Sequence, residues 1–231
     1  MSLSYIALDT DRDGMSTDAI IFDLDGTLLD TLADLAASAN HMLIVLGAET
    51  HATDTYKQLI GDGIRTLVRL ALPDKLRDRE TVTRGVELMR DEYGRRWSDA
   101  TRPYPGVEEL LSELDARRLP MAVLSNKPHD FTREIVSTFL GNIPFRRVIG
   151  ARPSAPKKPD PTTALEIAAS IDAIPGRTFF VGDSGVDMKT AVNAGMVPIG
   201  VSWGFRTADE LRHAGARILL GKPSELLCHV E

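Results

Sequence analysis

The regular pattern of the chain begins with a short, mostly apolar run at residues 19–24, Ala-Ile-Ile-Phe-Asp-Leu, which leads into Asp25-Gly26. A short apolar run that stops at an Asp-Gly pair is typical of a buried strand followed by a turn. We therefore expect the first strand of a sheet at this position.

The following segment carries a helical pattern instead. From Asp30 to about Trp97, apolar residues recur three and four positions apart, which is the spacing of one helix face. The positions that show it are Leu32, Leu35, Ala36, Ala39, Leu43 and Leu46, then Ile64, Leu67, Val68 and Ala71, then Val82, Val86, Met89 and Tyr93. No strand-like run interrupts them. Residues 30–99 are therefore predicted to form an all-helical domain inserted after the first strand.

Beyond residue 100, short apolar runs alternate with helical segments. Strands are predicted at 120–124, 147–149, 178–181, 197–201 and 217–220, with helices before, between and after them. Such alternation implies a parallel sheet with right-handed crossovers and helices on both faces. The predicted fold class is α/β: a doubly wound, Rossmann-like parallel sheet forms a core domain of residues 1–29 and 100–231, and the helical domain is inserted into it.

Polar clusters occur where the predicted strands end, which is where ligands bind in doubly wound sheets. The clusters are Asp23, Asp25, Gly26 and Thr27; Ser125, Asn126 and Lys127; Lys157, Lys158 and Asp160; and Asp183, Ser184 and Asp187. Residues of these types also cap helices and form turns, which would explain any one cluster. The convergence of carboxylates, hydroxyls and lysine from four segments favours a functional site.

The residue types in these clusters suit phosphoryl transfer. Asp23 and Asp25, two positions apart at a strand end, can act as nucleophile and as general acid and base. A carboxylate from another strand end supplies a hard oxygen site for Mg²⁺. A serine hydroxyl, turn amides and a lysine can bind phosphoryl oxygens. Phosphoryl transfer depends on positioning and on charge stabilisation, and these groups supply both.

The chain contains four short motifs: DLDGT at 23–27, Ser125-Asn126, Lys158-Pro159 and GDSGVD at 182–187. With these motifs it resembles the haloacid dehalogenase superfamily, in its branch with a small helical cap. The resemblance implies that Asp23 is the nucleophile, forming an aspartyl-phosphate, and that Asp25 is the acid and base. It implies that Lys158, rather than Lys157, neutralises the phosphoryl charge. The implied phosphate-binding residues are Gly26, Thr27, Ser125, Asn126 and Lys158, and the implied Mg²⁺ ligands are Asp23, Asp25 through its carbonyl, Asp183 and Asp187.

Asp25 narrows the reaction that the resemblance implies. Dehalogenases of this superfamily lack the second aspartate because their leaving group needs no proton, so Asp25 favours phosphate-ester cleavage or phosphomutase action. The segments Asp30-Thr31, Tyr104–Val107 and Ser125–Pro128 are most similar to phosphoglycolate phosphatases. We expect a Mg²⁺-dependent phosphatase acting on a small phosphorylated metabolite. A sugar phosphomutase, or a binding or regulatory member without turnover, remains an alternative.

The inserted helical domain contains one candidate for substrate selectivity, the segment Ile60–Arg65. Gly61 and Gly63 allow backbone amides to approach a ligand, and Arg65 could pair with a carboxylate or a second phosphate. A helix-starting turn with a solvated arginine explains the same residues equally well. Asn126, Lys127 and Arg206 are further candidates on the substrate side.

Charge and composition exclude several other classes. With 27 basic and 33 acidic residues, a net charge of −6 and one cysteine, we expect neither nucleic-acid binding nor a disulfide framework. No apolar run approaches the roughly 18 residues of a membrane span, and no secretory signal is present, so we expect no membrane association and a cytoplasmic location. We expect a monomer or a homodimer. Residues 9–14 resemble the start of a calcium loop, but its twelfth position is Ile20, so we predict a solvated extension there.

Overall fold

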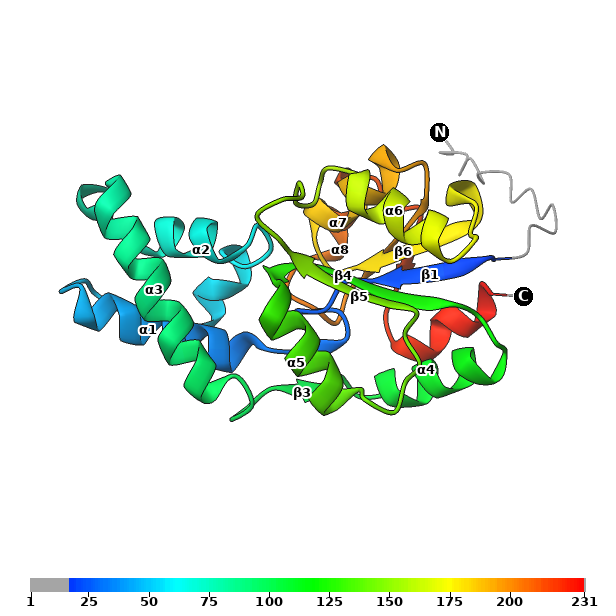
Figure 1. Cartoon of the computed structure of the whole chain (residues 1–231), viewed down its shortest axis with the longest axis horizontal. Helices are drawn as coiled ribbons and strands as arrows, with labels where there is room; N and C mark the ends of the chain where they lie inside the picture. The colour runs from blue at the N-terminus through cyan, green and yellow to red at the C-terminus, as the bar shows by residue number, and fades with distance from the viewer. Residues whose placement is uncertain (1–16, 231) are drawn as a thin grey trace, which may run out of the picture.

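The computed structural model of the protein describes residues 17–230 (Figure 1). The segment 9–14 and most of the predicted N-terminal extension lie outside the described residues. Within residues 17–230, no helix is long and apolar enough to cross a membrane.

Six parallel strands form one sheet, in the order β5-β4-β1-β6-β7-β8. Its strands are β1 (Ala19–Phe22), β4 (Met121–Pro128), β5 (Arg147–Ala151), β6 (Thr178–Gly182), β7 (Val197–Val201) and β8 (Ile218–Leu220). From β1 the chain first extends the sheet to β5, and then returns to the other side of β1 and continues to β8. The strand order therefore reverses between β1 and β6, which is where doubly wound sheets bind their ligands.

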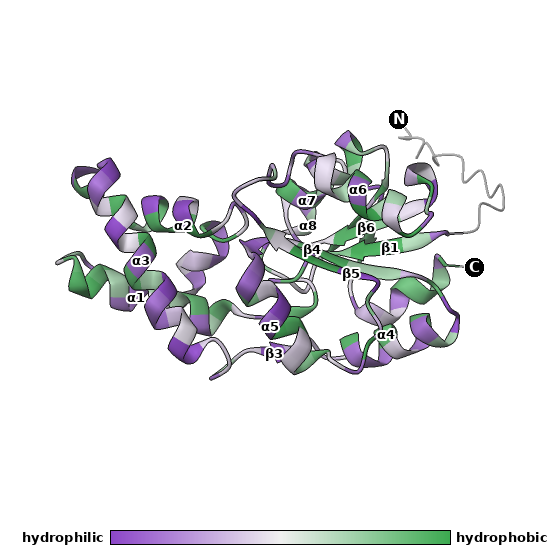
Figure 2. Ribbon diagram, viewed as in Figure 1, coloured by the Kyte–Doolittle hydropathy of each residue, from purple (hydrophilic) through white to green (hydrophobic). Residues whose placement is uncertain are grey.

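Helices cover both faces of this sheet, as Figure 1 shows. Because side chains alternate along a strand, Ile20 and Phe22 of β1 pack on one face and Ala19 and Ile21 on the other. The first face carries α4 (Val107–Ala116), α5 (His129–Phe139) and the 3₁₀ helix η4 (Pro223–Cys228), and the second carries α6 (Thr162–Ser170), α7 (Gly185–Asn193) and α8 (Ala208–His213). The strands form a hydrophobic layer between them (Figure 2). The predicted α/β fold class is thus confirmed.

The chain between β1 and β4 forms a helical lobe at one end of the sheet. A two-stranded antiparallel ribbon, β2 (Leu29–Asp30) with β3 (Arg102–Pro103), joins the outgoing and returning chain. Between these strands the structure contains only helices: α1 (Leu32–Val45), η1 (Thr53–Gln58), α2 (Ile64–Ala71), η2 (Asp74–Leu76) and α3 (Arg79–Arg96). Their inner faces pack together through residues such as Met42, Val68 and Met89, which are at most 1% exposed.

Some element boundaries differ from the predictions. β1 ends at Phe22, because the chain turns after Asp23, and β4 extends beyond Leu124 to Pro128. Ser125, Asn126 and Lys127 interrupt the apolar run on which the prediction was based, although pairing with β5 resumes at Pro128. The 3₁₀ helices η1 and η2 are too short to show the repeated apolar spacing that predicts a helix. The helix predicted at the end of the chain is also a 3₁₀ helix, η4.

Candidate active site

Asp23 and Asp25 lie in a tight turn directly after the central strand β1. The carbonyl of Leu24 accepts hydrogen bonds from the amides of Leu28 at 3.0 Å and Leu29 at 3.1 Å, which closes the turn. Gly26 adopts a φ of +86°, in the left-handed region that glycine favours. A Cβ at Gly26 would overlap the Asp183 carboxylate. The glycine therefore allows the turn after β1 to pack against the loop after β6.

Lys158 reaches into this site from the loop before α6. Its Nζ lies 2.7 Å from Asp23 Oδ1 and donates to Asp187 Oδ1 at 2.6 Å. The Lys158 side chain is 2% exposed, and burial alone would lower its pKa, but the carboxylates of Asp187 and Asp23 raise the pKa above its ordinary value. Lys158 therefore remains charged. Lys157 extends instead toward Gly63, where its Nζ lies 2.9 Å from the position that a Cβ would take.

Asn126 fixes the backbone that carries Lys158. Its Oδ1 accepts from the amide of Lys158 at 3.0 Å, and its Nδ2 donates to the carbonyls of Lys158 and Gly61, both at 3.0 Å. The side chain of Asn126, expected to bind phosphate, is thus engaged with backbone groups of the core loop and of the helical lobe.

Asp183 and Asp187 follow β6, at the start of α7. Ser184 and Asp187 form a reciprocal capping box, in which Ser184 Oγ accepts from the Asp187 amide at 3.3 Å and Asp187 Oδ2 accepts from the Ser184 amide at 3.1 Å. Asp187 Oδ2 also accepts from the Ser184 hydroxyl at 2.6 Å. Both oxygens of Asp187 are therefore in use, one on Ser184 and one on Lys158. Asp183 Oδ2 accepts from the amide of Phe205 at 2.7 Å. The capping box explains locally why this sequence starts a helix beside the site.

The carboxylates of Asp23, Asp183 and Asp187 form a compact acidic cluster, in which one oxygen from each lies within 4.8 Å of the others. Burial and the charge of Asp187 raise the pKa of Asp23 from 3.8 to about 7, against the opposing effect of Lys158. Burial and the neighbouring carboxylates of Asp187 and Asp23 raise the pKa of Asp183. A bound cation would relieve this repulsion, and carboxylate oxygens are the ligands that Mg²⁺ prefers. Asp23 and Asp183 fit such an ion best, since Asp187 already holds Lys158 and Ser184.

Asp25 has a separate set of partners. Its Oδ1 accepts from the Thr31 hydroxyl at 2.7 Å and from Lys127 Nζ at 2.7 Å. Burial acts to lower the pKa of Lys127, but the Asp25 carboxylate and Tyr93 together outweigh burial and raise that pKa. Each aspartate of the DLDGT motif is thus paired with a different lysine, Asp23 with Lys158 and Asp25 with Lys127.

The structure divides the other predicted phosphate-binding residues into two groups. Ser125 lines the pocket beside Asp23 and Asp25, and its Oγ accepts from the Lys127 amide at 3.2 Å. Gly26 and Thr27 do not line that pocket. Gly26 packs against Asp183, and the Thr27 hydroxyl donates to Asp183 Oδ1 at 3.5 Å. Their contacts place them as supports of Asp183.

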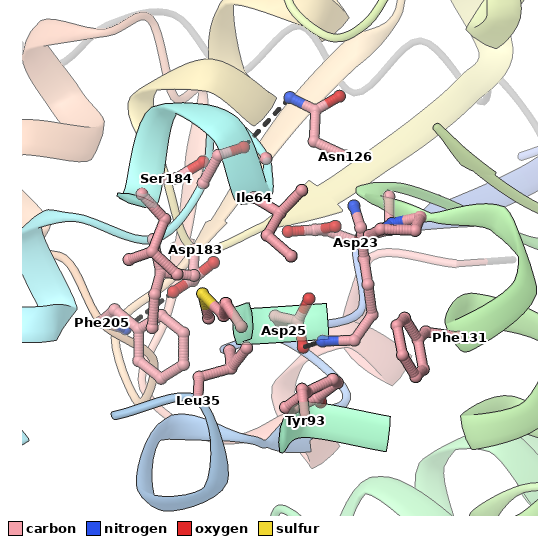
Figure 3. A pocket seen from close by; sticks show the side chains of 18 of the residues that line it. Asp23, Asp25, Leu35, Ile64, Tyr93, Asn126, Phe131, Asp183, Ser184 and Phe205 are labelled. Atoms are coloured by element: carbon pink, nitrogen blue, oxygen red, sulfur yellow. Dashed lines mark hydrogen bonds and ion pairs between the residues drawn. The ribbon is translucent and has the colours of Figure 1, made fainter. Parts of the chain in front are cut away.

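A pocket lies between these groups and the helical lobe, and Figure 3 shows Asp23, Asp25 and Asp183 around it. The helical lobe contributes mostly apolar residues to the lining: Leu35, Ile60, Ile64, Leu67 and Met89, with Gly61, Gly63 and Tyr93. An apolar wall of this kind displaces water from the carboxylates on the opposite side.

Arg65, for which a contact with the substrate and a solvated position were both expected from the sequence, does not line this pocket. Its side chain is exposed and its Nη2 donates to Thr83 Oγ1 at 3.2 Å. The reason is helical geometry. Ile64 and Leu67 of α2 face the pocket, and the residue after Ile64 is turned about 100° away from that face.

Besides Asp23 Oδ1, which faces the Lys158 ammonium, two pocket residues carry buried polar atoms that have no hydrogen-bond partner among the described residues, the Tyr93 hydroxyl and Arg206 Nη1. Tyr93 is on α3, at one of the positions whose spacing predicts the buried face of that helix. Burial raises its pKa to about 12, so its hydroxyl stays protonated. The only sequence signal for a polar group of α3 at the pocket is a residue with a polar end at a core position of an amphipathic helix.

The chain matches the family described as haloacid dehalogenase-like hydrolase over residues 20–201, and it belongs to this family. It is 32% identical over 204 residues to the phosphoglycolate phosphatase of Psychrobacter arcticus, covering 86% of this chain and 89% of the relative. It is 30% identical over 208 residues to the phosphoglycolate phosphatase of Aquifex aeolicus, covering 90% of this chain and 94% of the relative.

Solved structures agree with this assignment. The crystal structure of a predicted phosphoglycolate phosphatase from Haemophilus somnus superposes with a TM-score of 0.85 at 26% identity, covering 92% of this chain and 97% of that one. CbbY from Rhodobacter sphaeroides, crystallised with phosphate, has the same fold, with a TM-score of 0.75 at 22% identity, covering 91% of this chain and 96% of that one.

Proposed function

We propose that this protein is a Mg²⁺-dependent phosphatase that hydrolyses a small phosphorylated metabolite through an aspartyl-phosphate on Asp23, with phosphoglycolate as the first candidate. The observation that carries the proposal is the placement of Lys158 Nζ 2.7 Å from Asp23 Oδ1, with the Asp183 carboxylate beside them and Asp25 in the same pocket. The phosphoglycolate phosphatases among its relatives support the choice of substrate.

In the first half of the reaction, a carboxylate oxygen of Asp23 attacks phosphorus and the ester oxygen departs. Asp25, in its protonated form, donates a proton to that oxygen, and the Thr31 hydroxyl hydrogen-bonds to its carboxyl group. Lys158 lies against the nucleophile, so its ammonium offsets negative charge on the transferring group. In the second half, Asp25 takes a proton from the water that attacks the aspartyl-phosphate.

Asp23 and Asp183, with the backbone carbonyl of Asp25, would hold the metal ion. When bound, Mg²⁺ supplies charge neutralisation and a fixed position for a phosphoryl oxygen. The apolar wall of the helical lobe excludes bulk water during the first half, and the lobe must open before the second half can follow.

The direct test is phosphate release from phosphoglycolate and from a panel of phosphorylated metabolites. The wild-type enzyme should release phosphate with Mg²⁺ and lose activity when the metal is chelated. Asp23→Asn should fold normally and lose at least about a thousandfold in kcat. Retained turnover in Asp23→Asn would refute the assignment of the nucleophile.

The alternatives from the sequence have distinct outcomes in the same experiment. Isomerised sugar phosphate, formed in the presence of a sugar bisphosphate, would indicate a phosphomutase. No phosphate release from any ester would indicate a binding or regulatory protein. The cytoplasmic location and the monomeric or dimeric state remain predictions.

A further inference from the structure

Arg206, in the loop after β7, lies where the core meets the helical lobe. Its Nε pairs with Glu210 Oε1 at 3.1 Å, and its Nη2 donates to the carbonyls of Ile60 at 2.9 Å and Gln58 at 3.4 Å. The remaining nitrogen, Nη1, is buried and has no partner among residues 17–230. The Arg206 side chain is 10% exposed and lines the pocket.

A buried guanidinium nitrogen without an acceptor is energetically unfavourable, so a ligand that supplies an acceptor gains that interaction on binding. The guanidinium is held in place by Glu210 and by the carbonyls of Gln58 and Ile60. Arg206 Nη2 lies 4.0 Å from the position that a Cβ on Gly61 would take, and Gly61 itself lines the pocket. The free nitrogen is thus part of a fixed group at the pocket wall.

The other groups in this part of the pocket do not offer a second cationic donor. Leu35, Ile60, Ile64 and Leu67 line it with apolar side chains. Lys127, the other cation in the lining, is already paired with Asp25. Carboxylate burial among apolar groups is unfavourable unless a charged donor binds it. Arg206 is therefore the group best placed to bind a carboxylate on the leaving group.

We propose that Arg206 determines the substrate specificity of this site, and that its Nη1 binds a carboxylate on the leaving group of a small phosphate monoester. This inference rests on the proposed phosphatase function, and it assigns to Arg206 the role that the sequence suggested for Arg65. Because the same guanidinium also contacts the carbonyls of Gln58 and Ile60, substrate binding and closure of the helical lobe are coupled through one side chain.

The test compares phosphoglycolate with ethyl phosphate, in which a methyl group replaces the carboxylate. Arg206→Gln should lower kcat/KM for phosphoglycolate by roughly 10- to 100-fold more than kcat/KM for ethyl phosphate, because both substrates share the loss of the contacts to Gln58 and Ile60 but only phosphoglycolate loses the carboxylate contact. Arg206→Lys, which keeps the charge but not the forked geometry, should show an intermediate, equally selective loss. Arg65→Gln is the matched control, an exposed arginine outside the pocket, and should preserve the ratio between the two substrates.

Equal losses for both substrates in the Arg206 variants would mean that Arg206 only holds the helical lobe closed, and would overturn the inference. So would unchanged activity, or a selective loss in Arg65→Gln. A binding experiment separates this inference from the proposed function. In an Asp23→Asn background, calorimetry should show that Arg206→Gln weakens the binding of phosphoglycolate but not the binding of inorganic phosphate. If no ester is hydrolysed by the wild type, the phosphatase proposal fails, and this binding comparison still decides the role of Arg206.

Discussion

Asp25 and Lys127 form a buried ion pair, with 2.7 Å between Oδ1 and Nζ. Asp25 belongs to the turn after β1, and Lys127 to β4. The Lys127 ammonium also lies 4.7 Å from the centroid of the Tyr93 ring on α3. One lysine thus connects the turn after β1, the neighbouring strand and the helical lobe.

Replacing Lys127 with methionine should destabilise the protein by about 3 kcal/mol, because it leaves a largely buried carboxylate without its cation. Asp25 would also lose a partner that orients it, so kcat should fall by at least about tenfold. Urea unfolding and p-nitrophenyl phosphate turnover measure the two effects. Lys127→Arg keeps the charge and should lose less of both. If Lys127→Met unfolds at the same urea concentration as the wild type, the pair contributes no stability.

The raised pKa of Asp23 predicts a pH-dependent effect of Asp23→Asn on stability. Since its pKa rises from 3.8 to about 7 on folding, the folded state binds one more proton than the unfolded state between these values. The contribution of Asp23 to stability therefore falls as the pH rises through this range. Without divalent ions, the free energy of unfolding of Asp23→Asn relative to that of the wild type should increase by roughly 2–3 kcal/mol when the pH is raised from about 5 to about 8. Urea unfolding at both pH values checks this, and a constant difference would contradict the raised pKa.

Magnesium should stabilise the wild type more at about pH 8 than at about pH 5, because protons and the metal compete for the same carboxylates. The measurement is the thermal midpoint with Mg²⁺ and with a chelator at each pH. Asp183→Asn provides the control and should respond little to Mg²⁺ at either pH. Equal stabilisation at both pH values would argue against metal binding by these aspartates.

Asp34 connects the two ends of the helical lobe. Its carboxylate, 3% exposed, accepts from the amides of Ala100 at 3.0 Å and Thr101 at 2.8 Å, and from the Thr101 hydroxyl at 2.8 Å. Asp34→Ala should cost about 3 kcal/mol, because it removes charge-assisted hydrogen bonds and leaves buried amides without an acceptor. Urea unfolding gives the free energy, and faster proteolysis near residue 100 would report a loosened connection. Ser38→Ala, which removes one hydroxyl donor to the Asp34 carbonyl, should cost no more than about 1 kcal/mol. Equal effects of the two substitutions would contradict the role of the carboxylate.

Gly26→Ala should disrupt the site, because its Cβ would overlap the Asp183 carboxylate. We expect kcat to fall at least about a hundredfold, since the nucleophile turn and Asp183 can no longer pack together. Gly47→Ala is a matched control: Gly47 also has a positive φ, +70°, but nothing lies within 4 Å of its Cβ position. It should cost about 1 kcal/mol in urea unfolding and keep normal kcat. Normal activity in Gly26→Ala would show that the contact with Asp183 is not needed.

Much of the fold could be predicted because the relevant signals are local. The apolar residues Phe179–Val181, followed by Ser184 and Asp187, predict a buried strand and a capped helix, and β6 and α7 occupy these positions. The end of β4 was predicted wrongly, because Lys127 is polar in sequence although its side chain is buried against Asp25 and Tyr93. Polarity alone does not distinguish a charged residue in solvent from one with a buried partner.

By itself, the sequence determined that acidic side chains and a lysine meet at one edge of a parallel sheet, because parallel strands place their carboxyl ends together. Only the tertiary structure decided which residues complete the pocket. Arg206 contacts the carbonyl of Ile60, 146 positions away in the chain, and Tyr93 enters from α3, whereas Arg65 turns outward. These positions depend on how each helix is rotated against its neighbours and on how the helical lobe closes on the core, and neither is encoded in a local pattern of residues.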